Sequence, residues 1–167
     1  MKRSIRISER LLLLGYSLIL VFMIVQDWIP IGTLNDVDAI HASRSINELI
    51  IVTLIGVIQI VILIALTALF VGKRYPLWAK LWLIIHPSFI FSGALLDWWI
   101  PYVFGYGAEE RVATYTEMFG DTHSFLPTMN GIVPNTIHTM FHIILLICII
   151  LTVYISFTNS SSVKKSR

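Results

Sequence analysis

Four long, mostly apolar stretches dominate this chain and limit what it can fold into. They cover residues 11–29, 49–71, 81–100 and 137–157 of the 167-residue sequence. A bilayer core about 30 Å thick is crossed by roughly 20 mostly apolar helical residues, and each stretch has about that length. The sequence therefore predicts an all-α bundle of four transmembrane helices.

The composition also indicates an integral membrane protein. Charged residues make up 13% of the chain and hydrophobic residues 56%, whereas a soluble domain carries about 25% charged residues. These values exclude a soluble globular enzyme, a nucleic-acid-binding domain and a disordered chain. The one cysteine, Cys148, excludes a disulfide framework and a thiolate zinc site. Because the spans and their connections use nearly the whole sequence, we predict a single membrane domain over residues 1–167 with the lipid bilayer as its partner.

The basic residues predict the orientation of the bundle. Cytoplasmic loops carry an excess of Lys and Arg, and ten of the twelve basic residues lie in three segments that four spans place on one side. They are Lys2, Arg3, Arg6, Arg10, Lys73, Arg74, Lys80, Lys164, Lys165 and Arg167. Only Arg44 and Arg111 lie on the other side. We therefore predict a multi-pass plasma-membrane protein with both termini cytoplasmic and an uncleaved first helix. The isoleucine-rich, alanine-poor composition favours a bacterial origin.

Four ionisable residues should lie at one depth in the outer third of the bilayer. Counting about 1.5 Å per helical residue places Asp27, Asp97, His138 and His142 in this layer. Ionisable groups within spans usually face the interior of the bundle or a cavity. The sequence therefore predicts an outward-facing polar pocket built from these four residues.

The two histidines also have the spacing of a metal-binding pair. His138 and His142 lie at i and i+4, so both imidazoles project from one face of a helix. With Asp97, Asp27 and, from the loop above, His123 as further ligands, nitrogen and carboxylate donors suit zinc, iron or manganese. Glu117 and Asp121 would form the rim of the pocket. In the alternative interpretation, the histidines only satisfy hydrogen bonds within the bundle.

The second outer loop predicts a further short element. Residues 108–119 carry apolar side chains at helical spacing, which is typical of an amphipathic helix lying at the membrane interface. The following segment is interrupted by Pro127, Asn130-Gly131 and Pro134 and predicts turns. Asn135 or Thr136 is suited to cap the last helix.

Two motifs carry a resemblance to known proteins. DWWIPYVFG at 97–105 and THSFLPTMNGIVPNTIHTMFH at 122–142 resemble a pattern of small bacterial four-helix integral membrane proteins to which no activity is attached. The likeness covers roughly residues 81–157. The four-span outline with a short basic turn after the second span also resembles, in topology only, the EXPERA group of sterol isomerases and the sigma-2 receptor.

Several functions remain open at this point. The polar pocket could bind a metal or small ligand, or perform acid–base chemistry on a lipid-like substrate, so the sequence does not decide whether the chain is an enzyme. The alternative is an accessory, structural or immunity-type subunit that contacts another membrane protein, or a second copy, through its helices. A transporter would need to dimerise, because four spans are few and no internal repeat is visible.

Overall fold

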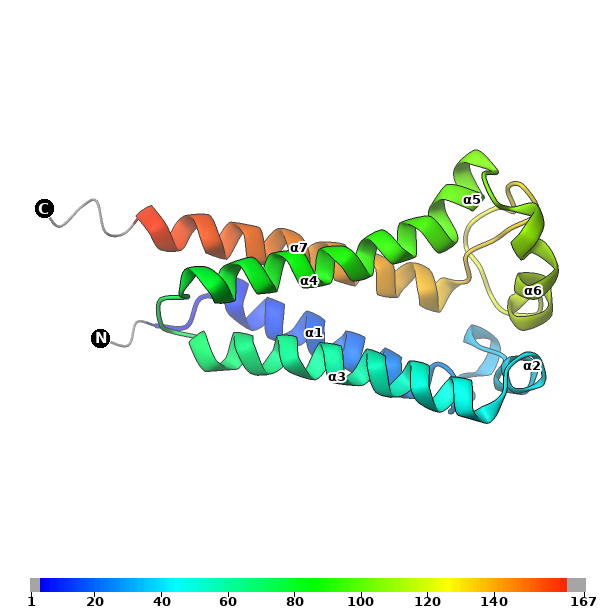
Figure 1. Cartoon of the computed structure of the whole chain (residues 1–167), viewed down its shortest axis with the longest axis horizontal. Coiled ribbons are helices and arrows are strands. Elements are labelled where there is room, and N and C mark those ends of the chain that lie inside the picture. Colours follow the sequence, from blue (N-terminus) through cyan, green and yellow to red (C-terminus); the bar gives the residue numbers. More distant parts are fainter. Residues whose placement is uncertain (1–3, 162–167) are drawn as a thin grey trace, which may run out of the picture.

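A computed structural model describes residues 4–161 and shows four helices long and apolar enough to cross a membrane. They are α1 (Ile7–Val25), α3 (Ile46–Phe70), the continuous segment Leu77–Phe104 and α7 (Thr136–Ser161). Over the described residues the chain is helical, with one isolated β-bridge between Met129 and Ile132 and no strand. The predicted all-helical fold with four candidate membrane-spanning helices is thereby confirmed for the described residues, and Figure 1 shows the long helices running side by side.

The third span contains a change of helical type near its outer end. It begins as α4 (Leu77–Ala94), continues as the π-helical turn η2 (Leu95–Trp99) and ends as α5 (Ile100–Phe104). Gly105, with φ of +74°, ends it in the left-handed conformation that glycine adopts without strain. A π-turn inserts a residue into the helix and shifts the following side chains around the axis, so the directions of Asp97, Trp98 and Trp99 depart from a regular helical count.

Two short helices cover one end of the bundle. The connection between α1 and α3 holds η1 (Gly32–Leu34) and α2 (Val37–Ser43), and the connection after α5 holds α6 (Glu109–Phe119). α2 and α6 pack against each other, and Figure 1 shows both at the same end of the long helices. We call α2, α6 and their loops the cap. The helix expected over 108–119 is confirmed as α6, while its position at a membrane interface stays a prediction.

α1 and α7 form the centre of the bundle. They pack against each other, α3 packs mainly against α1, and α4 packs mainly against α7. Leu12, Tyr16 and Ile19 of α1 are fully buried in one core with Leu145 and Cys148 of α7. By contrast, α3 and α4 meet only slightly, and Figure 1 shows them diverging toward the cap. The bundle is therefore least closed between these two helices.

α1 begins and α7 ends at the same end of the bundle, opposite the cap (Figure 1). Which side of a membrane this end faces stays a prediction from the basic residues. Five of those residues lie outside the part of the chain that the structure describes: Lys2, Arg3, Lys164, Lys165 and Arg167.

Candidate functional site

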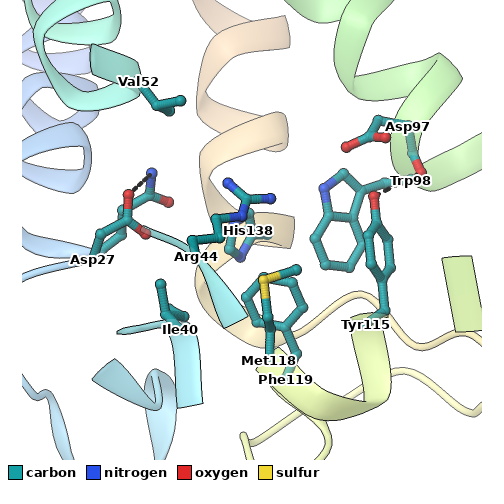
Figure 2. A pocket seen from close by; sticks show the side chains of 11 residues that line it. Asp27, Ile40, Arg44, Val52, Asp97, Trp98, Tyr115, Met118, Phe119 and His138 are labelled. Atoms are coloured by element: carbon teal, nitrogen blue, oxygen red, sulfur yellow. Dashed lines mark hydrogen bonds between the residues drawn. The ribbon is translucent and has the colours of Figure 1, made fainter. Parts of the chain in front are cut away.

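A cavity of about 150 Å³ lies where the cap meets the long helices. The end of α1, α2, α3, η2, α6 and α7 each contribute to its wall, and Figure 2 shows their side chains converging on it. The wall consists of Gln26, Asp27, Ile40, Arg44, Val52, Asp97, Trp98, Tyr115, Met118, Phe119 and His138. We call this space the capped cavity. It combines charged groups with an aromatic and aliphatic lining, which is the usual composition of a ligand pocket.

Asp27 enters the capped cavity because α1 ends early. The first span was expected to continue to residue 29, but α1 ends at Val25. Asn35 ties the turn that follows: its Nδ2 donates to the carbonyl oxygens of Gln26 at 2.8 Å and Ile29 at 2.9 Å. This turn carries Asp27 out of the helix and leaves it buried.

The carboxylate of Asp27 is only weakly stabilised by its neighbours. Nε2 of Gln26 donates to its Oδ2 at 3.4 Å. Burial raises the pKa of the Asp27 carboxyl, and the positive charges of Arg44 and His41 offset this only in part. Because Gln26 donates through Nε2, its Oε1 is the free amide atom, and this oxygen is buried without a hydrogen-bond partner. The cavity therefore holds a carboxyl that resists ionisation and an unused acceptor.

Arg44 brings a cation to the same place. It ends α2, and Figure 2 shows its side chain between Asp27 on one side and Trp98 on the other. Within residues 4–161, the guanidinium has no hydrogen bond and no ion pair, although it interacts electrostatically with Asp27. An arginine side chain has five N–H donors in a planar fork that suits carboxylate or phosphate oxygens. Those donors remain available to a ligand.

Asn135, the residue that caps the N-terminus of α7, holds the ring of His138 in one tautomer. Oδ1 of Asn135 accepts the backbone N–H of His138 at 3.1 Å and also contacts Nδ1 of the ring at 2.7 Å. A backbone N–H only donates, so the amide atom is the oxygen and Nδ1 must carry the ring proton. In the neutral ring Nε2 is then an acceptor, and it has no hydrogen bond with a described residue. The rings of Phe22, Trp98 and Phe119 surround the imidazole at centroid distances of 5.5, 4.9 and 5.1 Å.

His142 has the opposite tautomer and a different neighbour. Nε1–H of Trp99 donates to its Nδ1 at 3.1 Å, and an indole N–H has no acceptor role. The ring of His142 therefore carries its proton on Nε2. The two imidazole centroids are 6.4 Å apart, so the histidines are neighbours as their spacing predicted. His142 does not line the capped cavity but faces an adjoining groove that His138 shares.

Asp97 lines the capped cavity, but its carboxylate pairs with Arg111 at the edge of the cavity. Its side chain is 58% exposed, and Oδ1 accepts from Nε of Arg111 at 3.4 Å. The hydroxyl of Tyr115 donates to the backbone oxygen of Asp97 at 3.2 Å. Burial, followed by the interaction with Asp97, raises the pKa of Tyr115 above its usual range. Tyr115 is thus a neutral hydrogen-bonding wall of the cavity.

The loop residues expected above the pocket lie elsewhere. Nδ1 of His123 contacts Oγ1 of Thr136 at 2.7 Å, and His123 is exposed. Glu117 and Asp121 are exposed and do not line the capped cavity. Among residues 4–161, no group of three or more His, Cys, Asp or Glu side chains is placed to hold a metal ion. The expected ligands His138, His142, Asp97, Asp27 and His123 are thus not gathered into one such group among the described residues.

The structure brings three of the expected site residues, Asp27, Asp97 and His138, to one cavity. It adds Arg44 as the cation, which the sequence had marked only as one of two basic residues on the side opposite the basic segments. Asn135 was expected as a cap, and its second contact, to the ring of His138, was not foreseen. A histidine three residues after a capping Asn is the signal that could have predicted it.

The fold has four helices long and apolar enough to cross a membrane, and the cavity is a polar site at one end of them. The chain matches no protein-family model, and comparisons with curated proteins and with solved structures give no match. The likeness to small four-helix membrane proteins therefore rests on the four apolar helices alone. The side chains of the capped cavity are the basis for assigning a function.

Proposed function

We propose that this chain is a multi-pass cell-membrane protein, with both termini cytoplasmic, that binds a small anionic ligand in the capped cavity. The observation that carries this proposal is the guanidinium of Arg44, which lies in the cavity without a hydrogen bond or ion pair to any described residue. Arg44 is exposed, so an anion can reach its guanidinium, and hydrogen bonds between a charged donor and an anion are stronger than neutral ones.

The other free groups specify what the ligand carries besides its charge. Nε2 of His138 and Oε1 of Gln26 are acceptors without a described partner. They complement the hydrogen of a hydroxyl or an amine. A ligand with one anionic group for Arg44 and at least one hydroxyl therefore matches the cavity, and glycerol phosphate is the simplest compound with both.

The acidic residues of the wall oppose such a ligand less than their number suggests. Burial raises the pKa of Asp27, so this carboxyl retains a proton more readily than an exposed one. The Asp97 carboxylate is directed to Arg111. Arg44 is thus the charged group of the wall that remains open to an incoming anion.

Titration of the purified full chain with sn-glycerol 1-phosphate tests this proposal. We expect saturable binding by calorimetry, and Arg44→Gln should weaken it about tenfold or more, since a hydrogen bond to a charged group contributes about 1.5–3 kcal/mol. Arg10→Gln is the matched control, because Arg10 is an exposed arginine on α1 at the end opposite the cap. Absence of binding, or equal binding by the Arg44 variant, contradicts the proposal.

A second candidate is an accessory or immunity-type subunit that acts through helix contacts. The observation that favours it is that both histidine rings already have partners in the chain, Asn135 for His138 and Trp99 for His142. Under this alternative, His138→Phe lowers the unfolding temperature and glycerol phosphate does not bind even to the wild type. Binding that depends on Arg44 favours the ligand-binding function.

A further inference from the structure

The capped cavity adjoins a larger apolar groove of about 440 Å³. Five residues line both spaces, so the polar cavity and the groove adjoin: Gln26, Val52, Asp97, Trp98 and His138. The rest of the groove is mainly aliphatic and aromatic, with Ile55 of α3, Ile90 of α4 and Phe141 of α7 among its wall. The combined space is polar at the end under the cap and apolar along the helices.

The groove lies on the least closed side of the bundle. α3 and α4 meet only slightly, and Figure 1 shows them separating toward the cap. Gly93 of α4 lines the groove, and a Cβ atom built on it meets no other atom within 4 Å. In a bilayer, this opening faces the hydrocarbon, so a molecule already dissolved in the membrane can enter sideways.

We propose that the ligand of this site is a single-chain phospholipid that enters between α3 and α4, with its phosphate at Arg44 and its chain in the groove. This inference rests on the proposed function and names its ligand class. The phosphate takes the free donors of Arg44, and a glycerol hydroxyl donates to Nε2 of His138. The groove volume lies in the usual range of about 300–1,000 Å³ for small-molecule sites, which suits one chain.

The shared wall of the polar cavity and the apolar groove favours a lipid over a transmembrane helix as the occupant. A helix with its side chains is about 10–12 Å across, and its apolar surface would cover the groove but bring no anionic group to the guanidinium of Arg44. An amphipathic lipid occupies both regions at once, because its charged head and apolar chain are joined end to end.

The experiment uses the full chain in phosphatidylcholine nanodiscs with a lysophosphatidylglycerol that carries a photoreactive group on its chain. We expect saturable labelling of α3, α4 or α7 peptides that line the groove. Gly93→Phe should reduce labelling at least tenfold, since its ring fills the groove without meeting a neighbouring atom at Cβ. Ser92→Phe, which places the same ring on the adjacent exposed position outside the groove, should label like the wild type.

Two further arms test the headgroup. Arg44→Gln should weaken labelling about tenfold, and Arg44→Lys should weaken it less, because Lys keeps the positive charge but loses the planar fork of donors. A monoacylglycerol of the same chain length, which lacks phosphate, should compete at least tenfold less well than unlabelled lysophosphatidylglycerol. Equal competition would overturn the assignment of a phosphate to Arg44.

The outcomes separate this inference from the proposed function. Equal, non-saturable labelling of wild type and Gly93→Phe would mean annular lipid only and would overturn the inference. If glycerol phosphate binds through Arg44 but the lysolipid does not, the inference fails and the anion site stands. If neither binds, both fail. A second copy of the chain cross-linked across α3 and α4 would also overturn the lipid assignment. As a control for folding, wild type and Gly93→Phe should have matching unfolding temperatures.

Discussion

Asn135→Ala is the substitution that most fully tests how the site is held together. Asn135 is nearly fully buried, and its Oδ1 accepts from both the backbone N–H and the ring of His138. Loss of a capping side chain costs about 1 kcal/mol, and loss of a buried hydrogen bond to the ring costs about 1 kcal/mol more. We therefore expect the unfolding free energy of Asn135→Ala to fall by about 2 kcal/mol.

The same substitution should also change the tautomer of His138. Without Oδ1 nearby, nothing among the described residues holds the proton on Nδ1, and Nε2 ceases to be a fixed acceptor. Asn135→Asp is the matched control, because a carboxylate keeps both contacts and replaces the amide Nδ2, which is buried without a partner. Thermal unfolding in a mild detergent measures the stability, and ¹⁵N chemical shifts of the imidazole report the tautomer.

Wild-type-like unfolding of Asn135→Ala, or equal destabilisation of Asn135→Asp and Asn135→Ala, would show that the two contacts of Oδ1 do not stabilise the fold. An unchanged Nδ1–H tautomer in Asn135→Ala would separately show that another group directs the ring of His138. Binding of glycerol phosphate should follow the tautomer, with the alanine variant weaker than the aspartate variant.

Three further predictions concern the hydrogen bonds, pH dependence and orientation. Trp99→Phe removes the donor to Nδ1 of His142 and should lower the unfolding free energy by about 1 kcal/mol; in that background, His142→Phe should cost less than it does in the wild type. Since burial raises the pKa of Asp27, its contribution to stability is present below the ordinary carboxyl value of about 3.9 and is lost as the pH rises through the raised value. Asp27→Asn should therefore gain stability relative to the wild type between acid and neutral pH, and an identical pH profile of unfolding would contradict this. A reporter fused after Arg167 should indicate the cytoplasm and one inserted near Asn130 the outside, whereas the reverse result at both positions would invert the orientation.

The four long helices could be predicted from the sequence because hydrophobic length alone determines a span. The ends of these helices were predicted less accurately, because they depend on contacts with other segments of the chain. α1 ends at Val25, four residues before the expected boundary, because Asn35 from the next loop bonds the carbonyl of Gln26. The hydropathy of α1 could not predict this end, because Asn35 lies outside the helix.

For the candidate site, the sequence could predict the level of a residue along the bundle but not the direction of its side chain. The helical rise brought Asp27, Asp97 and His138 to one level, and all three line the capped cavity. Direction was harder to predict, because the π-turn over Leu95–Trp99 shifts the face of Asp97, whose side chain is largely exposed and pairs with Arg111. Arg44 could not be assigned from periodicity, since its place in the wall depends on how α2 folds back over the bundle.

The most direct test of the central claim is the ¹⁵N spectrum of the histidine side chains during titration with sn-glycerol 1-phosphate, with His138 assigned from the His138→Phe variant. We expect a neutral ring protonated on Nδ1 in the free protein, and a saturable shift of Nε2 that is lost in Arg44→Gln and kept in Arg10→Gln. A free protein protonated on Nε2, or an Nε2 signal that does not respond to the ligand, would contradict the assignment of the capped cavity as an anion-binding site.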